Sequence, residues 1–191
     1  MKQLLFATFL LLLTAAAVQA ASLEIDLNDF SVQGQYFQPI TDDEYGTSMF
    51  DLRGLYNDHQ DTVLVSGGFD FLGKPGNVPG LEVGVGLQGY GGQTTRGPLD
   101  RDLAAVALGA RATYRPPVLQ GVGFGAKLFY APEILSFLDT EHLYEGAVRV
   151  DYALTARIHV FTEYQEIRAD YDDVGTRRID EGLRVGFQAQ F

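Results

Sequence analysis

Apolar residues occupy every second position along most of this chain, and the alternation is clearest at its C-terminal end. Leu183, Val185, Phe187, Ala189 and Phe191 alternate with glycine and polar residues. Successive residues of a strand point to opposite faces, so this segment forms a strand with one apolar face and one polar face. Because the same period recurs through the chain, an all-β fold is predicted.

Ten segments with this period of two follow one another after Ala20. They are predicted as strands at residues 23–27, 30–36, 50–56, 63–71, 81–88, 106–114, 122–130, 144–152, 158–171 and 183–191. Together they predict a small antiparallel transmembrane β-barrel, in which an even number of strands returns the chain to the side where it began. The first segment is shorter than the ~9–11 residues that a spanning strand needs. A barrel of eight strands with an irregular N-terminal hairpin is therefore the alternative to ten.

Glycine, proline and polar residues mark the connections between these segments. Both chain ends are predicted to be periplasmic, together with the connections at residues 73–80, 116–120 and 155–156. The external connections are predicted at residues 91–100, 131–139 and 172–177, of which residues 131–139 are the most apolar.

The alternation changes parity after Tyr164. Ile167, Ala169 and Tyr171 are the apolar residues that follow, and they fall on the other set of alternate positions. An inserted residue would return both sets to one face, so a β-bulge is predicted after Tyr164.

The N-terminus has the composition of a secretory signal peptide. Met1-Lys2 gives a positive start, residues 4–18 are apolar, and Val18-Gln19-Ala20 is a small-residue cleavage site. Residues 1–20 are therefore predicted to be a signal peptide, which leaves residues 21–191 as one barrel domain. The chain has no cysteine, which suits an envelope protein that folds without disulfides.

The charge balance excludes several classes of partner. Fourteen Lys and Arg residues stand against 25 Asp and Glu, for a net charge of −11. Nucleic acid is excluded as a partner, because phosphate binding needs clustered Lys and Arg. A polybasic attachment to anionic lipid is excluded for the same reason.

Charged residues recur on the strand face opposite the apolar one. Burial in a dry core would require a partner or water for each of them, whereas acids and bases can interdigitate inside a narrow barrel. The predicted lumen charge network consists of Asp51, Arg53, Asp70, Glu82, Arg111, Lys127, Glu145, Arg149, Asp151 and Arg184.

Aromatic residues of the apolar face gather towards the strand ends, with aliphatic residues between them. Two aromatic belts around an aliphatic band are typical of a membrane barrel. The belts are predicted at Tyr36, Phe71, Tyr114 and Tyr152 on the periplasmic side and at Tyr56, Tyr130 and Tyr144 on the outer side. A soluble, lipocalin-like barrel is the alternative, in which Val85, Leu108 and Val150 would converge on a shared core.

Two resemblances support export to the outer membrane. Arg184, Gly186, Ala189 and Phe191 resemble the C-terminal signal that the outer-membrane assembly machinery reads. The segments 71–81, 128–133 and 179–187 are similar to the YfaZ family of Gram-negative outer-membrane proteins, and the likeness covers essentially the whole mature chain. It implies location and architecture, and it carries over no catalytic residues.

Motifs for chemistry are sparse. Residues 121–127 resemble a phosphate-binding loop, but no Ser or Thr follows the lysine and the next residues form a strand rather than a helix. His59, His142 and His159 lack metal-ligand spacing, so no metal site is predicted.

One histidine suggests an enzyme. His142 falls at the outer end of its strand, close in sequence to Ser136, Glu133 and Glu141. Ser, His and a carboxylate near the outer interface could form the site of a lipid-modifying enzyme. A solvated histidine at a loop edge is the alternative interpretation.

The sequence therefore predicts an integral outer-membrane barrel, structural or a very narrow porin-like pore, with no enzymatic activity and no cofactor. Barrels of about eight strands have interiors just filled by side chains, whereas open aqueous channels come at about 16–18 strands. The expected partners are outer-membrane lipid and the assembly machinery. A lipid-modifying enzyme and a soluble periplasmic binder are the alternatives. Oligomeric state, solute and the openness of the lumen are left open.

Overall fold

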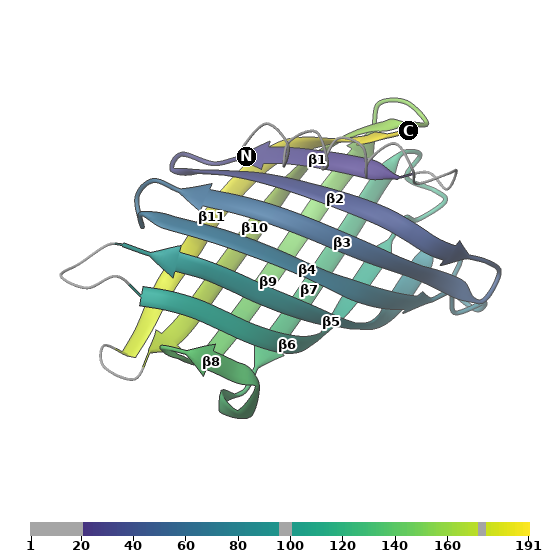
Figure 1. Cartoon of the computed structure of the whole chain (residues 1–191). Coiled ribbons are helices and arrows are strands. Elements are labelled where there is room, and N and C mark those ends of the chain that lie inside the picture. Colours follow the sequence, from purple (N-terminus) through teal and green to yellow (C-terminus); the bar gives the residue numbers. More distant parts are fainter. Residues whose placement is uncertain (1–20, 96–100, 172–174) are drawn as a thin grey trace, which may run out of the picture.

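The computed structural model describes residues 21–95, 101–171 and 175–191 (Figure 1). Within these ranges the chain forms one eleven-stranded sheet in which every pairing between neighbours is antiparallel. The predicted signal peptide, residues 1–20, lies outside the described residues. The strands are β1 (Ser22–Leu27), β2 (Ser31–Asp42), β3 (Gly46–Asn57), β4 (Thr62–Gly73), β5 (Leu81–Thr94), β6 (Arg101–Tyr114), β7 (Val122–Ala131), β8 (Ser136–Leu138), β9 (Thr140–Ala153), β10 (Ile158–Tyr171) and β11 (Gly175–Gln190).

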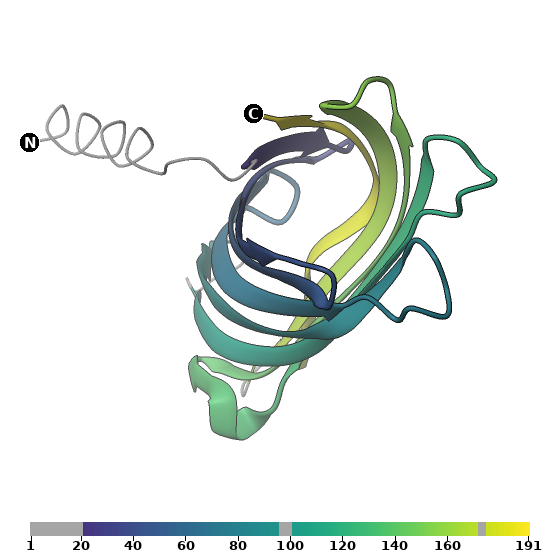
Figure 2. The same ribbon diagram turned by 90° about the vertical axis from the view of Figure 1, so that its right-hand side faces the viewer.

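The sheet closes on itself because the first strand pairs with the last. Ser22 of β1 lies opposite Gln190 of β11, and the same strand pairs with β2 on its other side. Ten strands complete the ring, which Figure 2 shows as a continuously curved wall. The remaining strand, β8, pairs with β6, opposite Leu103–Ala105, and lies outside the ring. The ten-stranded prediction is confirmed, and the short β1 belongs to the wall rather than to an irregular hairpin.

Side-chain direction follows the alternation read from the sequence. Val85, Leu108 and Val150 are 65%, 58% and 44% exposed, whereas Arg53 and Arg184 are fully buried. Apolar side chains therefore cover the outside of the barrel and charged ones line the inside, the arrangement that a bilayer requires. In the described ranges, no helix is both long and apolar enough to cross a membrane.

The two ends of the barrel differ, and each takes a name here. The terminal end carries Ala21, Phe191 and the connections at residues 43–45, 74–80, 115–121 and 154–157. The loop end carries the connections at residues 28–30, 58–61 and 132–139, together with the strand ends at Thr94, Arg101, Tyr171 and Gly175. Several strands extend further towards the loop end than predicted, since β5 continues to Thr94 and β11 begins at Gly175.

The predicted bulge lies in the neighbouring strand. Ile167, Ala169 and Tyr171 are buried and point into the lumen, as Gln165 does. The side chains of β10 therefore keep the same alternation along the whole strand. The irregularity falls where Ile167 and Arg168 pair with β11, and the extra residue there is Ile179. The sequence prediction was wrong because it assumed that apolar residues always face outward, whereas near the loop end they face the lumen.

An apolar core fills the lumen towards the loop end. These inward residues form one cluster, called the plug here: Leu55, Leu64, Tyr90, Leu103, Ala105, Ala107, Phe129, Ala131, Leu143, Ile167, Ala169, Tyr171 and Ile179. The ring of Phe129 packs against the wall at Gly109, where a Cβ atom would lie 2.3 Å from that ring. The plug also draws side chains from opposite walls, such as Leu55 of β3 and Leu143 of β9, as expected for a barrel of this size.

Candidate functional site: the charged lumen

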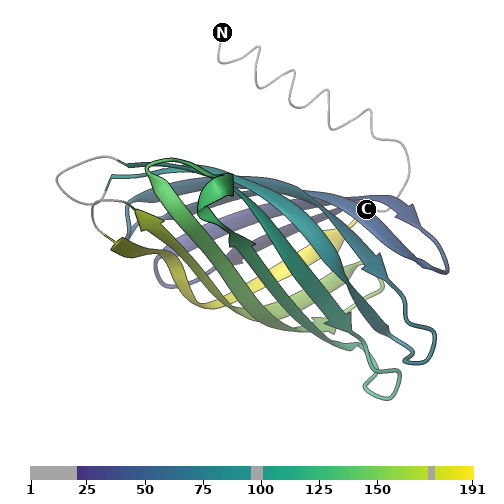
Figure 3. The same cartoon turned by 90° about the horizontal axis from the view of Figure 1, so that it is seen from below.

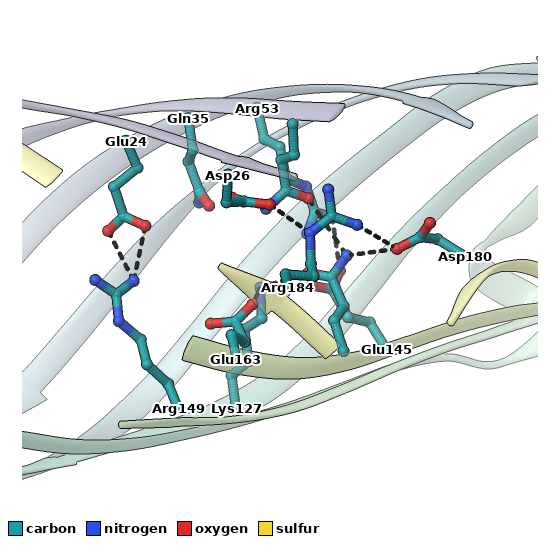
Figure 4. A network of polar contacts seen from close by, with 12 residues as sticks. Glu24, Asp26, Gln35, Arg53, Lys127, Glu145, Arg149, Glu163, Asp180 and Arg184 are labelled. Atoms are coloured by element: carbon teal, nitrogen blue, oxygen red, sulfur yellow. Dashed lines mark hydrogen bonds and ion pairs between the residues drawn. The ribbon is translucent and has the colours of Figure 1, made fainter. Parts of the chain in front are cut away.

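The predicted lumen charges all occupy inward-facing positions of the barrel wall. Figure 4 shows several of them pointing toward one another. The buried ones are Asp51, Arg53, Asp70, Glu145, Asp151 and Arg184. The half-buried ones are Glu82, Arg111, Lys127 and Arg149.

A salt bridge between Arg53 and Glu145 spans the lumen. Counted either way round the ring of ten strands, β3 and β9 are five places apart, so the two residues come from opposite walls. Two parallel hydrogen bonds of 2.6 and 2.7 Å join the guanidinium to the carboxylate, and each side chain is 1% exposed. The Lys127 ammonium lies 2.7 Å from the same carboxylate, and the Tyr90 hydroxyl donates to it over 2.7 Å. This fork-to-fork geometry fixes both partners across the bore.

A second cluster surrounds Arg184 near the seam between β1 and β11. Its guanidinium contacts Asp26, donates to Asp180 over 2.6 Å and donates to the Ser31 hydroxyl over 2.7 Å. Asn57, at the end of β3, donates to Asp180 over 2.7 Å. One arginine thus holds two buried carboxylates and links three segments of the wall.

Four acidic members of the lumen were missed in the sequence. Glu24 and Asp26 alternate with apolar residues in β1 and could have been found by the same rule as the others. Glu163 occupies an inward position of β10 by the same alternation. Asp180 could not have been found in this way, because it adjoins the bulge at Ile179, where two consecutive residues are buried.

Further pairs lie closer to the terminal end. Arg149 binds Glu24 with contacts of 2.7 and 2.9 Å, and its guanidinium stacks 3.6 Å from the centre of the Phe161 ring. Arg111 lies 3.0 Å from Asp70, and Arg115 lies 3.2 Å from Asp151. Asp51 accepts hydrogen bonds from two glutamines, Gln35 and Gln88, over 3.2 and 3.0 Å.

A vestibule of about 250 Å³, lined by both polar and apolar side chains, occupies the lumen on the terminal side of these pairs. Phe37, Met49 and Leu72 form an apolar part of its lining, while Arg111 and Arg149 contribute charge. The plug lies at the other end, and the Arg53–Glu145 bridge lies between the two. Among the described residues, the vestibule thus lies on the terminal side of the bridge and the plug on its loop side.

A shallow groove of about 500 Å³ lies on the outside of the wall, over β5, β6, β7, β9 and β10. Small residues such as Ala110, Ala126 and Gly146 form part of its surface, and Leu128 and Val148 border it. Its lining is predominantly apolar, in keeping with the rest of the barrel exterior.

Two residues of the suggested enzyme site, Ser136 and His142, have contacts with residues outside that site. The Ser136 hydroxyl donates to the backbone carbonyl of Pro132 over 3.1 Å. His142 Nδ1 lies 3.3 Å from the Tyr130 hydroxyl, and the two rings stack. The phosphate-loop-like segment forms the strand β7, and its Lys127 binds Glu145. Among the described residues, no group of three or more metal-binding side chains is arranged around a common centre.

The residues predicted for the aromatic belts lie on the barrel exterior, with Tyr36 half-buried. Tyr130 and Tyr144 are directly opposite each other on β7 and β9, in the half nearer the loop end. Phe71 and Tyr152 lie towards the terminal end and are 62% and 49% exposed. Whether these rings mark the bilayer interfaces stays a prediction.

The residues of the predicted assembly signal divide between the two faces of β11. Arg184 and Gly186 face the lumen, where a Cβ atom on Gly186 would lie 2.6 Å from the Phe161 ring. Ala189 belongs to the outward set. Phe191 follows the strand, is 66% exposed, and donates its backbone N–H to Ala21 over 3.0 Å.

We expect Phe191→Ala to reduce the amount of folded barrel in the envelope without reducing its stability. The exposed ring can be removed while the backbone hydrogen bond to Ala21 remains. Unheated gels of envelope fractions would show less of the compact, heat-modifiable band, whereas protein refolded from urea into detergent would match the wild type. Equal envelope levels in the variant and the wild type would contradict the assembly role.

Comparisons with known proteins give one family match. The family model described as "YfaZ precursor" matches residues 1–191. Among solved structures, the chain is similar to the KdgM porin, with 13% identity, a TM-score of 0.44, and coverage of 91% of this chain and 99% of that one. It is also similar to the outer membrane channel DcaP of Acinetobacter baumannii, with 14% identity, a TM-score of 0.47, and coverage of 92% and 55%. The search of curated proteins gave no match.

Proposed function

This chain belongs to the YfaZ family, and we propose that it is an integral outer-membrane β-barrel with a structural role and a lumen closed to solutes. The apolar exterior supports the membrane location, because outward Val85, Leu108 and Val150 oppose the lipocalin-like alternative. We place the terminal end in the periplasm, since Ala21 and Phe191 lie together on that side.

The observation that carries the closed state is the double obstruction of the lumen. The Arg53–Glu145 bridge joins opposite walls, and the plug fills the bore beyond it. Neither obstruction is a loop that could swing aside, because both are made of side chains of the wall itself. Buried ion pairs and tightly packed apolar side chains resist opening, since each separated partner would lose its contacts.

We expect purified wild-type protein to give no conductance steps above background in planar lipid bilayers. A matched variant, Phe129→Ala, removes the large ring that packs against Gly109 and tests whether the plug contributes to the seal. A heat-modifiable band from the same liposomes would show that the barrel has been incorporated. Regular conductance steps from the wild type would contradict the closed lumen and favour the narrow pore.

Location can be tested independently of conductance. An integral barrel stays in the membrane pellet when envelopes are washed with alkaline carbonate. Release of the mature protein in soluble form would contradict the membrane location and return the periplasmic binder as the better interpretation.

A further inference from the structure

The connection between β7 and β9 carries large apolar side chains that the barrel does not cover. It consists of the 3-10 turn η1 (Glu133–Leu135) and β8, and residues 132–139 are called the flap here. Ile134, Phe137 and Leu138 are 85%, 53% and 68% exposed. Contiguous exposed apolar residues of this size mark a surface that contacts a partner or a membrane.

The flap is attached to the outside of the barrel wall. β7 pairs with β6 only as far as the Leu108–Tyr130 pair, and β8 pairs with β6 further along, at Leu103–Ala105. Figures 1 and 3 show the flap beside the wall rather than beyond the end of the barrel, and Figure 2 shows it outside the ring. The flap therefore does not cover the mouth of the lumen.

The exposed side of the flap continues the apolar exterior. Phe137 lies opposite Ala104 of β6, whose side chain faces the outside of the wall as that of Leu108 does. Leu138 adopts a φ of +62°, in the left-handed region that bulky residues rarely occupy. This turn of the backbone leaves Phe137 and Leu138 exposed in succession, where a regular strand would turn one of them inward.

The opposite side of the flap is held against the barrel. Leu135 and Ser136 are half-buried, and the Ser136 hydroxyl closes the turn on the Pro132 carbonyl. The only charged side chain before Asp139 in this connection is that of Glu133, in the first turn of η1. The flap thus turns Ile134, Phe137 and Leu138 away from the protein.

We propose that the flap is a membrane anchor, with Ile134, Phe137 and Leu138 inserted among the lipid acyl chains beside β6. Lipid is the occupant that the structure favours, because the flap adjoins the wall that faces the bilayer and the five residues between Glu133 and Asp139 carry no charge. Transfer of these side chains from water to hydrocarbon is favourable for the same reason as burial in a protein core. This inference rests on the proposed membrane location of the barrel.

The chain has no tryptophan, so one introduced indole reports its own surroundings. The variants Phe137→Trp and Ile134→Trp are refolded into phosphatidylcholine vesicles with brominated acyl chains. Both are expected to emit at short wavelength and to be quenched by the bromines, and aqueous iodide should quench them poorly. Ile134 is so exposed that its replacement leaves the barrel contacts intact.

Two control variants make the outcomes distinguishable. Tyr45→Trp lies in the β2–β3 connection, is 78% exposed at the terminal end, and should show the emission of an indole in water. Val85→Trp lies on the wall and should be quenched by the bromines. If Val85→Trp is quenched while both flap variants behave like Tyr45→Trp, the flap is not an anchor and the membrane location stands. If Val85→Trp is not quenched either, the membrane location fails and the anchor fails with it.

Discussion

Replacing Arg184 with methionine is expected to lower the free energy of unfolding by about 3–5 kcal/mol. Methionine fills a similar volume but leaves Asp26 and Asp180 buried without their cation. Removing one partner from a buried ion pair costs far more than the pair contributes on its own, because the remaining charge stays desolvated. Urea titration of the refolded barrel, followed by the loss of the heat-modifiable band, measures the change.

Arg178→Met is the matched control for this prediction. Arg178 also forms an ion pair, at 2.6 Å with Glu181 on the same strand, but its side chain is 59% exposed. Exposed pairs contribute about 1 kcal/mol or less, so the control should change stability little. Equal effects of Arg178→Met and Arg184→Met would show that the lumen cluster is solvated rather than dry, and would contradict the closed lumen.

Val85→Arg is expected to destabilise the barrel in lipid vesicles by about 2–4 kcal/mol, the cost of an arginine on the lipid face near the bilayer midplane. Val85 lies midway along the apolar part of β5 and has ample space outward, so steric conflict does not contribute. In a soluble barrel the same substitution at an exposed position would be nearly neutral. The result therefore decides between lipid and water as the surroundings of the wall.

Val118→Arg serves as the control for surroundings. Val118 is 85% exposed, but it lies in the β6–β7 connection beyond the strands. An arginine there can reach water, so the free energy of unfolding should change by about 0.5 kcal/mol or less. If Val85→Arg is as mild as Val118→Arg, the apolar exterior does not face hydrocarbon and the membrane barrel is wrong.

Local side-chain direction could be predicted because it depends only on the backbone of each strand. Alternation in residues 81–88 and 144–152 sufficed to assign Val85 and Val150 to the outside and Glu145 to the inside. The same rule identified ten strands and most of the lumen charges. The rule that apolar residues face outward failed for Ile167, Ala169 and Tyr171. Near the loop end the interior is itself apolar, so an apolar residue there can face either side of the wall.

The amino-acid sequence by itself determined that the chain forms alternating strands and which side most of the charges face, and it favoured ten strands over eight. Only the tertiary structure decided which acid meets which base: Arg53 reaches Glu145 because ring closure places β3 and β9 on opposite walls. The plug also follows from ring closure, which brings its side chains together. The inward position of Asp180 follows from the bulge at Ile179. Side-chain direction is a property of neighbouring residues, whereas contact across the lumen depends on the register of every strand between the two partners.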